Sequence, residues 1–321
     1  MHIQILLTNE ITDQQWQEIV DGFNVSFSSN TTIEWLKVFS TSNHLGYCYH
    51  ALAIDNDKIV GYNVMTPFLY KNGLKIINSG SSYVLKEYRK DIFIFSDMLN
   101  ALYERCSLDG FAVSTGVPNM NSFEYSIKFL NCKHIANLDY YILPVNISTI
   151  LHKRYLLVFD FICKSVIWFY LFFFKTFYNN RIEKATKYEI LKSDLFYNNR
   201  FKQTEYKKIN MDKNTIYYRI VNEDGIKAAY LMDFVDENFS RNTSSLLIGI
   251  KDIFKNEAVD IIIFVGTLRI KPSILLKVPP KYVPKRLPFT IKFLTQEAKI
   301  KYADMLNMDN WSFSLLNFDG R

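Results

Sequence analysis

The sequence predicts a mixed α/β protein of two domains. Its 321 residues exceed the length of one ordinary domain. Apolar residues make up 49% of the chain, with 26 Phe and 21 Tyr, which is enough to form sizeable cores. Helical and strand periodicities alternate along the chain. We expect a first domain over residues 1–146, an apolar helical connector over 147–185 and a second domain over 186–321.

Two short helices are expected to open the first domain. Thr12 is followed three residues later by Gln15, the spacing of a capping box, and apolar residues then recur at helical intervals. The segment 31–34 repeats this cue. An antiparallel meander should follow, because the runs 47–54, 59–70 and 74–77 are β-rich and separated by polar turn residues.

The remainder of the first domain alternates between strands and helices. A short strand is expected to end near Val84 and Leu85, before a polar turn. Helices are then predicted from Ile92 to Cys106 and over 121–130, and strands over 111–117 and 135–143.

The second half loosely repeats this order. A hairpin is predicted over 215–221 and 226–234, a helix over 244–254, a strand over 260–265 and a terminal strand over 311–316. The similarity of the two orders hints at an internal duplication.

The segment from Tyr155 to Tyr178 is the most apolar in the chain, and three interpretations of it stay open. Asp160, Lys164 and Lys175 interrupt the run, whereas a membrane span needs about 18 nearly uncharged residues. The alternatives are a transmembrane helix, an aromatic helix lying in the membrane interface with basic flanks, and a buried interdomain helix.

The charge of the chain bears on which partners it could bind. The net charge of +6 is modest for this length and does not favour a nucleic-acid partner. From residue 268 to 293 the chain carries basic and no acidic residues, which indicates either a solvated proline-stiffened loop or a surface for phosphate, anionic glycan or anionic lipid.

No metal centre is expected, because the four cysteines are widely spaced and the five histidines form no ligand pattern. The N-terminus lacks the pattern of a secretion signal, so we expect a cytoplasmic protein, with peripheral contact with the inner membrane as an open alternative.

The turn before the predicted helix at Ile92 is a candidate phosphate site. The first turn of a helix leaves backbone N–H groups without partners, and the peptide dipoles add positive charge there. Arg89 and Lys90 lie immediately before it and would reinforce binding of an anion.

In this region the sequence resembles the Gcn5-related N-acetyltransferase (GNAT) family, in the form found in bacterial surface-polysaccharide clusters. Residues 59–62 are similar to the family's Val-Gly strand, and residues 84–89 to its entry to the pyrophosphate loop. Residues 117–122 resemble the Pro-Asn-x-x-Ser that leads into its next helix. The resemblance covers about residues 1–146.

The resemblance implies an acetyl-CoA or other acyl-CoA donor and a small-molecule amine acceptor, on a sugar or an amino acid. The strand end would hold the thioester, with the N–H near Leu85 polarising its carbonyl, and transfer would be direct. The implied donor-binding residues are Val84, Leu85, Arg89, Lys90, Asn119 and Ser122, and the implied catalytic acid is Tyr125. Asn119 is equally a good helix N-cap, and Tyr125 is equally a packing residue.

The departures from the family pattern support rival hypotheses. The turn lacks the family's glycines, and Asp91 would place a negative charge beside a diphosphate. If the side chain of Asp91 or Phe93 filled the helix start, the enzyme hypothesis would be lost and only the fold prediction would remain. The rivals are a non-catalytic binding protein of the same fold and a membrane-interface protein. Further candidate bases are Glu34, His44, His50 and Glu87. The second domain, 186–321, loosely resembles a reduced form of the same GNAT-like fold, and for it we expect acceptor binding or scaffolding.

Overall fold

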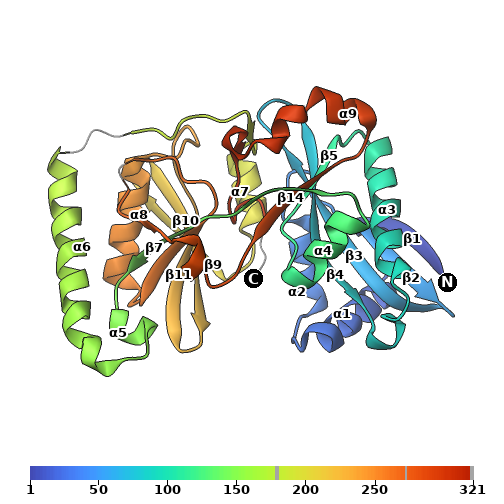
Figure 1. Cartoon of the computed structure of the whole chain (residues 1–321), viewed down its shortest axis with the longest axis horizontal. Coiled ribbons are helices and arrows are strands. Elements are labelled where there is room, and N and C mark those ends of the chain that lie inside the picture. The colour runs from blue at the N-terminus through green and yellow to red at the C-terminus, as the bar shows by residue number, and fades with distance from the viewer. Residues whose placement is uncertain (178–180, 272, 319–321) are drawn as a thin grey trace.

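The computed structural model describes residues 1–177, 181–271 and 273–318, whose strands form two large sheets beside each other (Figure 1). The first sheet has seven strands in the order β1 (His2–Leu7), β2 (Tyr49–Asp55), β3 (Lys58–Leu69), β4 (Lys75–Val84), β5 (Val113–Gly116), β14 (Pro288–Phe293) and β6 (Lys133–Asn137). All neighbours are antiparallel except β4 and β5, which are parallel.

The second sheet has a related arrangement. Its order is β13 (Leu276–Lys277), β7 (Tyr140–Pro144), β12 (Ile261–Val265), β11 (Ile226–Asp236), β10 (Asn214–Glu223) and β9 (Tyr206–Met211). Here β11 and β12 form the parallel pair. A short parallel pair, β8 (Tyr188–Glu189) with β15 (Trp311–Ser312), makes a third, small sheet. We call the parts of the molecule around the first and second sheets the first and second lobes.

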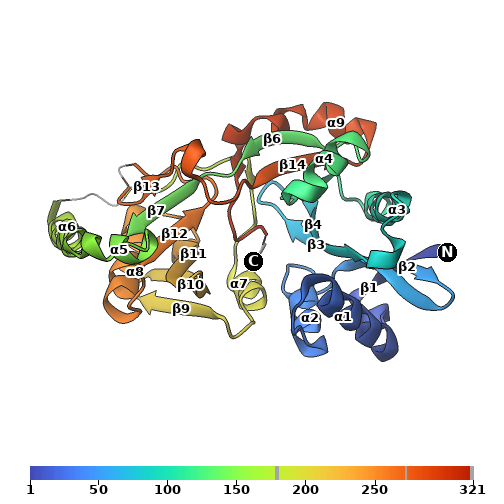
Figure 2. The same ribbon diagram turned by 60° about the horizontal axis from the view of Figure 1, so that its bottom comes forward.

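Helices cover both faces of the first sheet (Figure 2). One face carries α1 (Asp13–Phe27) and α2 (Ile33–Thr41), and the other carries α3 (Phe93–Leu108) and α4 (Met120–Lys128). The alternation of side chains along a strand produces this arrangement, since Leu52 packs with α1 whereas its neighbours Ala51 and Ala53 pack with α3. The capping box at Thr12 starts α1 as predicted.

The other helices belong mostly to the second lobe. They are α5 (Ile147–Ile150), α6 (Leu157–Phe177), α7 (Asp194–Arg200), α8 (Thr243–Asn256) and α9 (Gln296–Lys301). Short 3-10 helices lie at Thr8–Glu10, Lys86–Tyr88, Arg154–Leu156, Pro280–Tyr282, Ala303–Leu306 and Met308–Asn310.

The two lobes exchange strands. In the first sheet, the strand beside β5 is β14, which comes from the C-terminal half of the chain. In the second sheet, the strand beside β12 is β7, which follows directly on the first lobe. A parallel pair followed by an inserted antiparallel strand therefore recurs in both sheets, and each lobe supplies that strand to the other.

The mixed α/β architecture predicted from the sequence is confirmed, with differences at element boundaries. The predicted strand over 135–143 is two strands, β6 and β7, in different sheets. The expected domain boundary at residue 146 therefore lies beyond β7, which already belongs to the second sheet. The separate runs predicted over 74–77 and at 84–85 fall at the two ends of one strand, β4, which spans Lys75–Val84. The expected loop over 268–293 ends in strand β14. The predicted terminal strand keeps two residues, as β15.

The apolar segment forms α6, at the outer edge of the second lobe (Figure 1). The interpretation of a helix buried between domains is wrong, because only 11% of the apolar window within Arg154–Phe173 is buried. By length and composition alone, this helix could cross a membrane. Tyr178 lies outside the described residues.

Candidate functional site

The parallel pair of the first sheet opens at one end. β4 and β5 are in register from Ile76 with Val113 to Ser79 with Gly116, where β5 ends. β4 continues to Val84, paired with β3. The edge of β4 over residues 80–84 therefore has no pairing with β5, and the two chains separate there. We call this opening the first split.

A strand irregularity lies at the same place. Asn63 of β3 is in register with Ser82 and Met65 with Ser79, so Val64 alone faces two residues of β4. This count is that of a β-bulge, which turns the backbone of a strand. A Cβ atom added to Gly80 would lie 3.1 Å from the Val64 carbonyl oxygen, so the close approach of the two strands favours glycine there.

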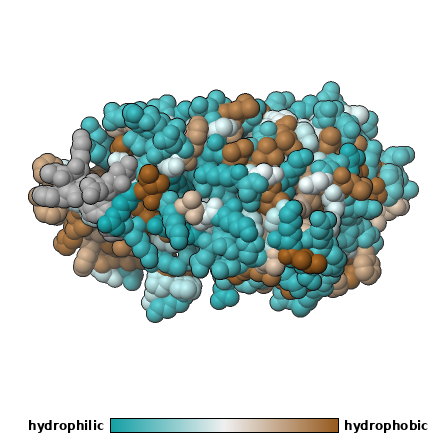
Figure 3. All heavy atoms as spheres, turned by 90° about the horizontal axis from the view of Figure 1, so that it is seen from above, coloured by the Kyte–Doolittle hydropathy of each residue, from teal (hydrophilic) through white to brown (hydrophobic). Residues whose placement is uncertain are grey.

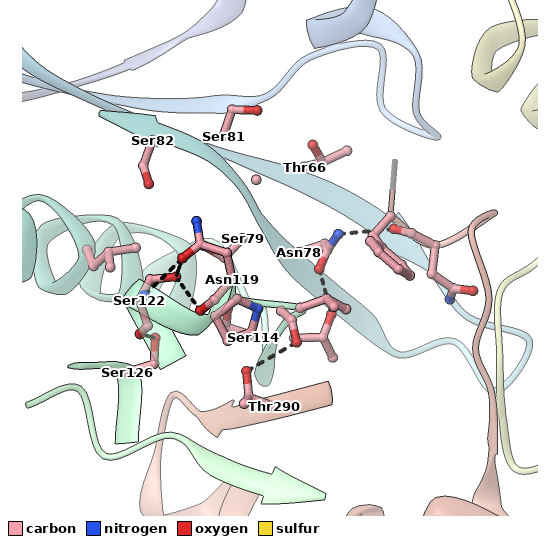
Figure 4. A pocket seen from close by; sticks show the side chains of 18 of the residues that line it. Thr66, Asn78, Ser79, Ser81, Ser82, Ser114, Asn119, Ser122, Ser126 and Thr290 are labelled. Atoms are coloured by element: carbon pink, nitrogen blue, oxygen red, sulfur yellow. Dashed lines mark hydrogen bonds between the residues drawn. The ribbon is translucent and has the colours of Figure 1, made fainter. Parts of the chain in front are cut away.

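A cavity of about 550 Å³ occupies the first split and is lined mostly by small hydroxyl side chains on its sheet walls (Figure 4). These come from β4 and β5, from the neighbouring strand β14 and from α4. They include Ser79, Ser81, Ser82, Ser114, Ser122, Ser126 and Thr290. A cavity of this size, with hydrogen-bonding groups at its walls, is suited to a small organic ligand.

The cavity reaches both faces of the sheet. On one face it is lined by Phe95, Leu99 and Tyr103 of α3. On the other face it is lined by aromatic residues of α1 and α2, among which Trp35 and Phe39 stack with ring centroids 5.5 Å apart. Two ligands approaching from opposite faces could therefore meet at the split.

The charged side chains of the wall are all basic. Arg200, Lys285 and Lys292 contribute to it. Arg200 donates to the carbonyl of Leu316, and Lys292 donates to the carbonyl of Leu130, at 3.0 and 2.6 Å. Within the described part of the chain, no aspartate, glutamate or histidine contributes to the wall.

Asn119 and Ser122 line the cavity, as the sequence predicts for donor-binding residues, but they also start α4. The Asn119 Oδ1 atom accepts from the Ser122 backbone N–H at 3.0 Å and from its hydroxyl at 3.1 Å. The N-cap alternative is therefore correct, and it leaves the Asn119 side-chain NH₂ as a donor beside the cavity.

Val84 and Leu85 lie at the end of β4, outside the cavity wall. The Leu85 backbone N–H donates to the Val60 carbonyl at 2.9 Å. It is therefore not available to polarise a thioester. The Val84 carbonyl accepts from the Arg89 Nε atom at 2.8 Å, which explains the orientation of that guanidinium.

The start of α3 differs from the expected phosphate site. Asp91 fills part of it, because its carboxylate accepts from the Phe93 backbone N–H at 3.0 Å. A carboxylate at this position satisfies one free amide and repels a diphosphate. Arg89 and Lys90 lie beside this turn and do not line the cavity. The geometry therefore gives no support for diphosphate binding at α3 in the expected manner.

Tyr125 does not face the cavity. Its hydroxyl donates to the Ile92 carbonyl at 2.5 Å, and its ring packs against Phe95 and Phe129. The packing alternative fits this geometry. Ser126, one residue on, lines the cavity instead.

The other candidate bases also lie elsewhere. His50 is fully buried between Thr8 and Tyr62, and burial lowers its pKa to about 3. His44 contacts the Leu191 carbonyl at 2.7 Å, and burial lowers its pKa as well. Glu34 and Glu87 are exposed. None of the four lines the cavity.

Sequence reasoning missed several wall residues. The run Ser79–Ser82 is visible in the sequence as a stretch of small residues. Its hydroxyls join those of other elements in one cavity wall only because β4 and β5 separate there. Thr290 donates to the Gly116 carbonyl at 3.1 Å from a strand 174 residues away, and no local pattern could have located it. Asn63 is buried in register with Ser82, and its amide has no hydrogen-bond partner among the described residues.

The second lobe has an equivalent split, but it is filled. β11 and β12 are in register from Ala228 to Leu231, and β11 then continues to Asp236. Asp233 is fully buried beyond the last pair and bonds to Arg241 at 2.5 Å. Arg241 also donates to Ser314 at 2.8 Å, so the C-terminal segment closes this split.

The described residues contain no group of three or more His, Cys, Asp or Glu side chains that could hold a metal ion. The wall of the cavity offers hydroxyls, amides, backbone groups, cations and the thiol of Cys132.

Solved structures share this fold. A GCN5-related N-acetyltransferase from Kribbella flavida is 10% identical, with a TM-score of 0.59 over 93% of this chain and 74% of that chain. A GCN5-related N-acetyltransferase from Anabaena variabilis is 8% identical, with a TM-score of 0.56 over 92% of this chain and 73% of that chain. Eis1 from Mycobacterium abscessus is 9% identical, with a TM-score of 0.50 over 96% of this chain and 76% of that chain. No family model and no curated protein matches the sequence. The chain thus has the fold of the GCN5-related N-acetyltransferases.

Proposed function

We propose that this protein is an acyl-CoA-dependent N-acyltransferase, with acetyl-CoA as the first donor to test. The observation that carries the proposal is the cavity in the first split, which is open to both faces of the sheet. Such a cavity can bring a thioester and an amine together from opposite sides, and this orientation is the main requirement of direct acyl transfer.

The donor would enter from the face of α3 and α4. The pantetheine arm of CoA carries amides that need hydrogen-bond partners, and the free NH₂ of Asn119 and the hydroxyls of Ser82 and Ser122 lie there. The unpaired edge of β4 would supply backbone N–H groups to the thioester carbonyl, in place of the occupied N–H of Leu85.

The acceptor would enter from the face of α1 and α2. Its amino group would be carried by a saccharide or by an amino-acid-type molecule, because the wall there combines aromatic rings with hydroxyls. Lys285 at the wall would favour an acceptor with an anionic group. A precursor of a cell-surface saccharide in the cytoplasm fits these features, and that choice depends on the sequence resemblance.

The reaction would proceed without a covalent enzyme intermediate. The neutral amine attacks the thioester carbonyl carbon, the C–N bond forms, and the C–S bond breaks. The amine loses a proton and the CoA thiolate gains one. Because no acidic or imidazole side chain of the described residues lines the cavity, water would carry these protons. The acyl-transfer rate should then rise with pH as the free amine becomes available.

A second candidate is a non-catalytic binding protein of the same fold. The contact of Asp91 with the Phe93 N–H favours it, since the carboxylate lies at the helix start and would repel a CoA diphosphate. The enzyme proposal therefore depends on the cavity of the first split and not on a diphosphate site at α3. The variant Asp91→Asn keeps an acceptor for that N–H and removes the charge. If the diphosphate binds at α3, we expect this variant to bind CoA roughly fivefold more tightly, which corresponds to about 1 kcal/mol.

The decisive experiment follows thiol release from acetyl-CoA in the presence of an aminosugar and of the matching sugar without the amine. We expect release that depends on the amine. Trp35→Ala should raise the KM for the acceptor and leave CoA binding unchanged. Binding of CoA without amine-dependent thiol release, over a panel of aminosugars and amino acids, would favour the non-catalytic candidate.

A further inference from the structure

The outward face of α6 is apolar and exposed. Nine large apolar side chains are between 40% and 74% exposed, namely Val158, Phe159, Phe161, Ile162, Val166, Trp168, Phe169, Phe172 and Phe173. Hydrophobic residues gather at the end of the molecule where α6 lies (Figure 3). Soluble monomers rarely expose a contiguous apolar surface of this extent, so it indicates a contact with something else.

The inward face of α6 fixes how the helix is turned. Asp160 accepts from the Ser148 backbone N–H at 2.8 Å and from its hydroxyl, which ties α6 to α5. Ile167 is 2% exposed and joins the core of the second sheet, with Tyr170 and Leu171 packed against it. These positions recur at helical spacing, so the helix is docked along its length.

The exposed side chains lie opposite to this docked face. At about 100° per residue, the nine positions cover the half of the helix that points away from Ile167. Ser165 is the one small polar residue among them. A lipid bilayer can bury this apolar half of the helix surface along the whole length of the helix, and aromatic residues are favoured at the membrane interface.

The charges around α6 suit an anionic surface. Lys153 and Arg154 precede the helix and are exposed, as is Lys164 at the border of the apolar face. Asp160 is the sole acidic residue between residues 151 and 173, and it is turned inward and bonded. Basic residues flanking an apolar helical face bind anionic headgroups while the face enters the acyl region.

We propose that α6 is an in-plane membrane anchor that binds the protein to an anionic lipid bilayer. The helix keeps its contacts with the second lobe and inserts its outward face between the headgroups. The strands and helices that line most of the cavity belong to the first lobe, and none of the described residues of α6 lines it. Because α6 lies at the far end of the second lobe (Figure 1), a bound bilayer leaves the cavity open. This proposal is independent of acyl transfer, because membrane binding is measured without any substrate.

The test is co-sedimentation of the full chain with vesicles of phosphatidylcholine, with and without phosphatidylglycerol. We expect sedimentation with the anionic vesicles, weaker binding without phosphatidylglycerol, and release by an alkaline wash. The triple variant Phe161→Ser, Phe169→Ser, Phe172→Ser should bind roughly tenfold more weakly or worse. In addition, the fluorescence of Trp168 should shift to the blue on binding, and Trp168→Phe should abolish that shift.

The matched control removes three exposed apolar side chains elsewhere, in Val25→Ser, Leu195→Ser, Ile300→Ser, which are 76%, 68% and 80% exposed. It should bind as the wild type does. The proposal is overturned if the wild type fails to sediment, or if both triple variants bind equally. Resistance to the alkaline wash would show a spanning helix instead. A dimer without vesicle binding, converted to a monomer by the α6 variant, would show that a second copy covers this face.

Discussion

At the scale of single residues, the candidate site depends on which side chains are already engaged. Asn119 caps α4 and still offers its NH₂ group, whereas Tyr125 and the N–H of Leu85 have partners elsewhere. Residue type and spacing predicted that these positions would contribute to one site. They could not predict the partners, because Val60 and Ile92 reach them through tertiary packing.

His50 gives a prediction for stability against pH. Its imidazole is fully buried, contacts Thr8 at 3.0 Å and Tyr62 at 2.9 Å, and has a pKa lowered to about 3 by burial. The unfolded chain protonates near pH 6.5, so the neutral ring stabilises the fold above that pH. This stabilisation is lost as pH falls from about 6.5 towards 3.

We expect the free energy of unfolding to fall by roughly 2 kcal/mol between pH 6.5 and 5 through His50. Urea unfolding at several pH values measures it. His50→Gln should flatten the dependence, leaving the smaller contribution of His44, whose pKa is also lowered. His134→Gln, which changes an exposed histidine, should retain the wild-type slope. An equally steep slope in His50→Gln would contradict the assignment.

At the scale of elements, local signals predicted what they control and missed what depends on distant pairing. Caps and helical spacing located α1, α2, α3, α4 and α8 within a few residues. Leu138 and Asp139 join β6 directly to β7, and no local pattern shows that the chain passes there from one sheet to the other. β14 lies in a basic, proline-rich stretch, and it is a strand because β5 and β6 pair with it on both sides.

The filled split of the second lobe gives a prediction at the same scale. Arg241 is 2% exposed in its side chain, bonds to Asp233 and Ser314, and lies over the Phe264 ring at 5.2 Å. The neighbouring cations Arg241 and Lys192 lower the pKa of the Asp233 carboxyl despite its burial. Removing Arg241 leaves that carboxylate with one cation, Lys192 at 3.2 Å.

Arg241→Ala should therefore destabilise the protein by about 3–5 kcal/mol, because the buried Asp233 carboxylate loses one of its two neighbouring cations. Lys213→Ala removes a cation from an exposed pair with Glu237, which solvent screens, so it should leave the stability close to that of the wild type. Urea unfolding at neutral pH compares the two variants. Equal, small losses would mean that the ion cluster does not hold the second split closed.

At the scale of the whole molecule, the exchanged strands make the lobes depend on each other. One hydrophobic cluster contains Ile76 and Val113 of the first sheet together with Tyr230 and Val265 of the second, with Trp311 fully buried among them. Loss of either sheet would expose this shared core. The chain should thus unfold as one unit, although its length suggests two.

Scanning calorimetry tests this cooperativity. We expect one transition whose calorimetric and van't Hoff enthalpies agree. Phe289→Ala in β14 and Ile262→Ala in β12, both at fully buried positions, should each lower the temperature of that same transition. Two resolved transitions, with each variant shifting only one, would contradict the shared core.

The proposed acyl transfer requires that CoA binds in the cavity of the first split. Calorimetric titration with CoA tests this directly in the wild type and two variants on the same helical turn. Ser122→Trp fills the cavity, whereas Asn121→Trp places the same side chain at an exposed neighbour outside the wall. We predict saturable binding that Ser122→Trp weakens at least roughly tenfold and Asn121→Trp leaves unchanged. Absence of binding to the wild type, or equal binding to all three proteins, would contradict the assignment of this cavity.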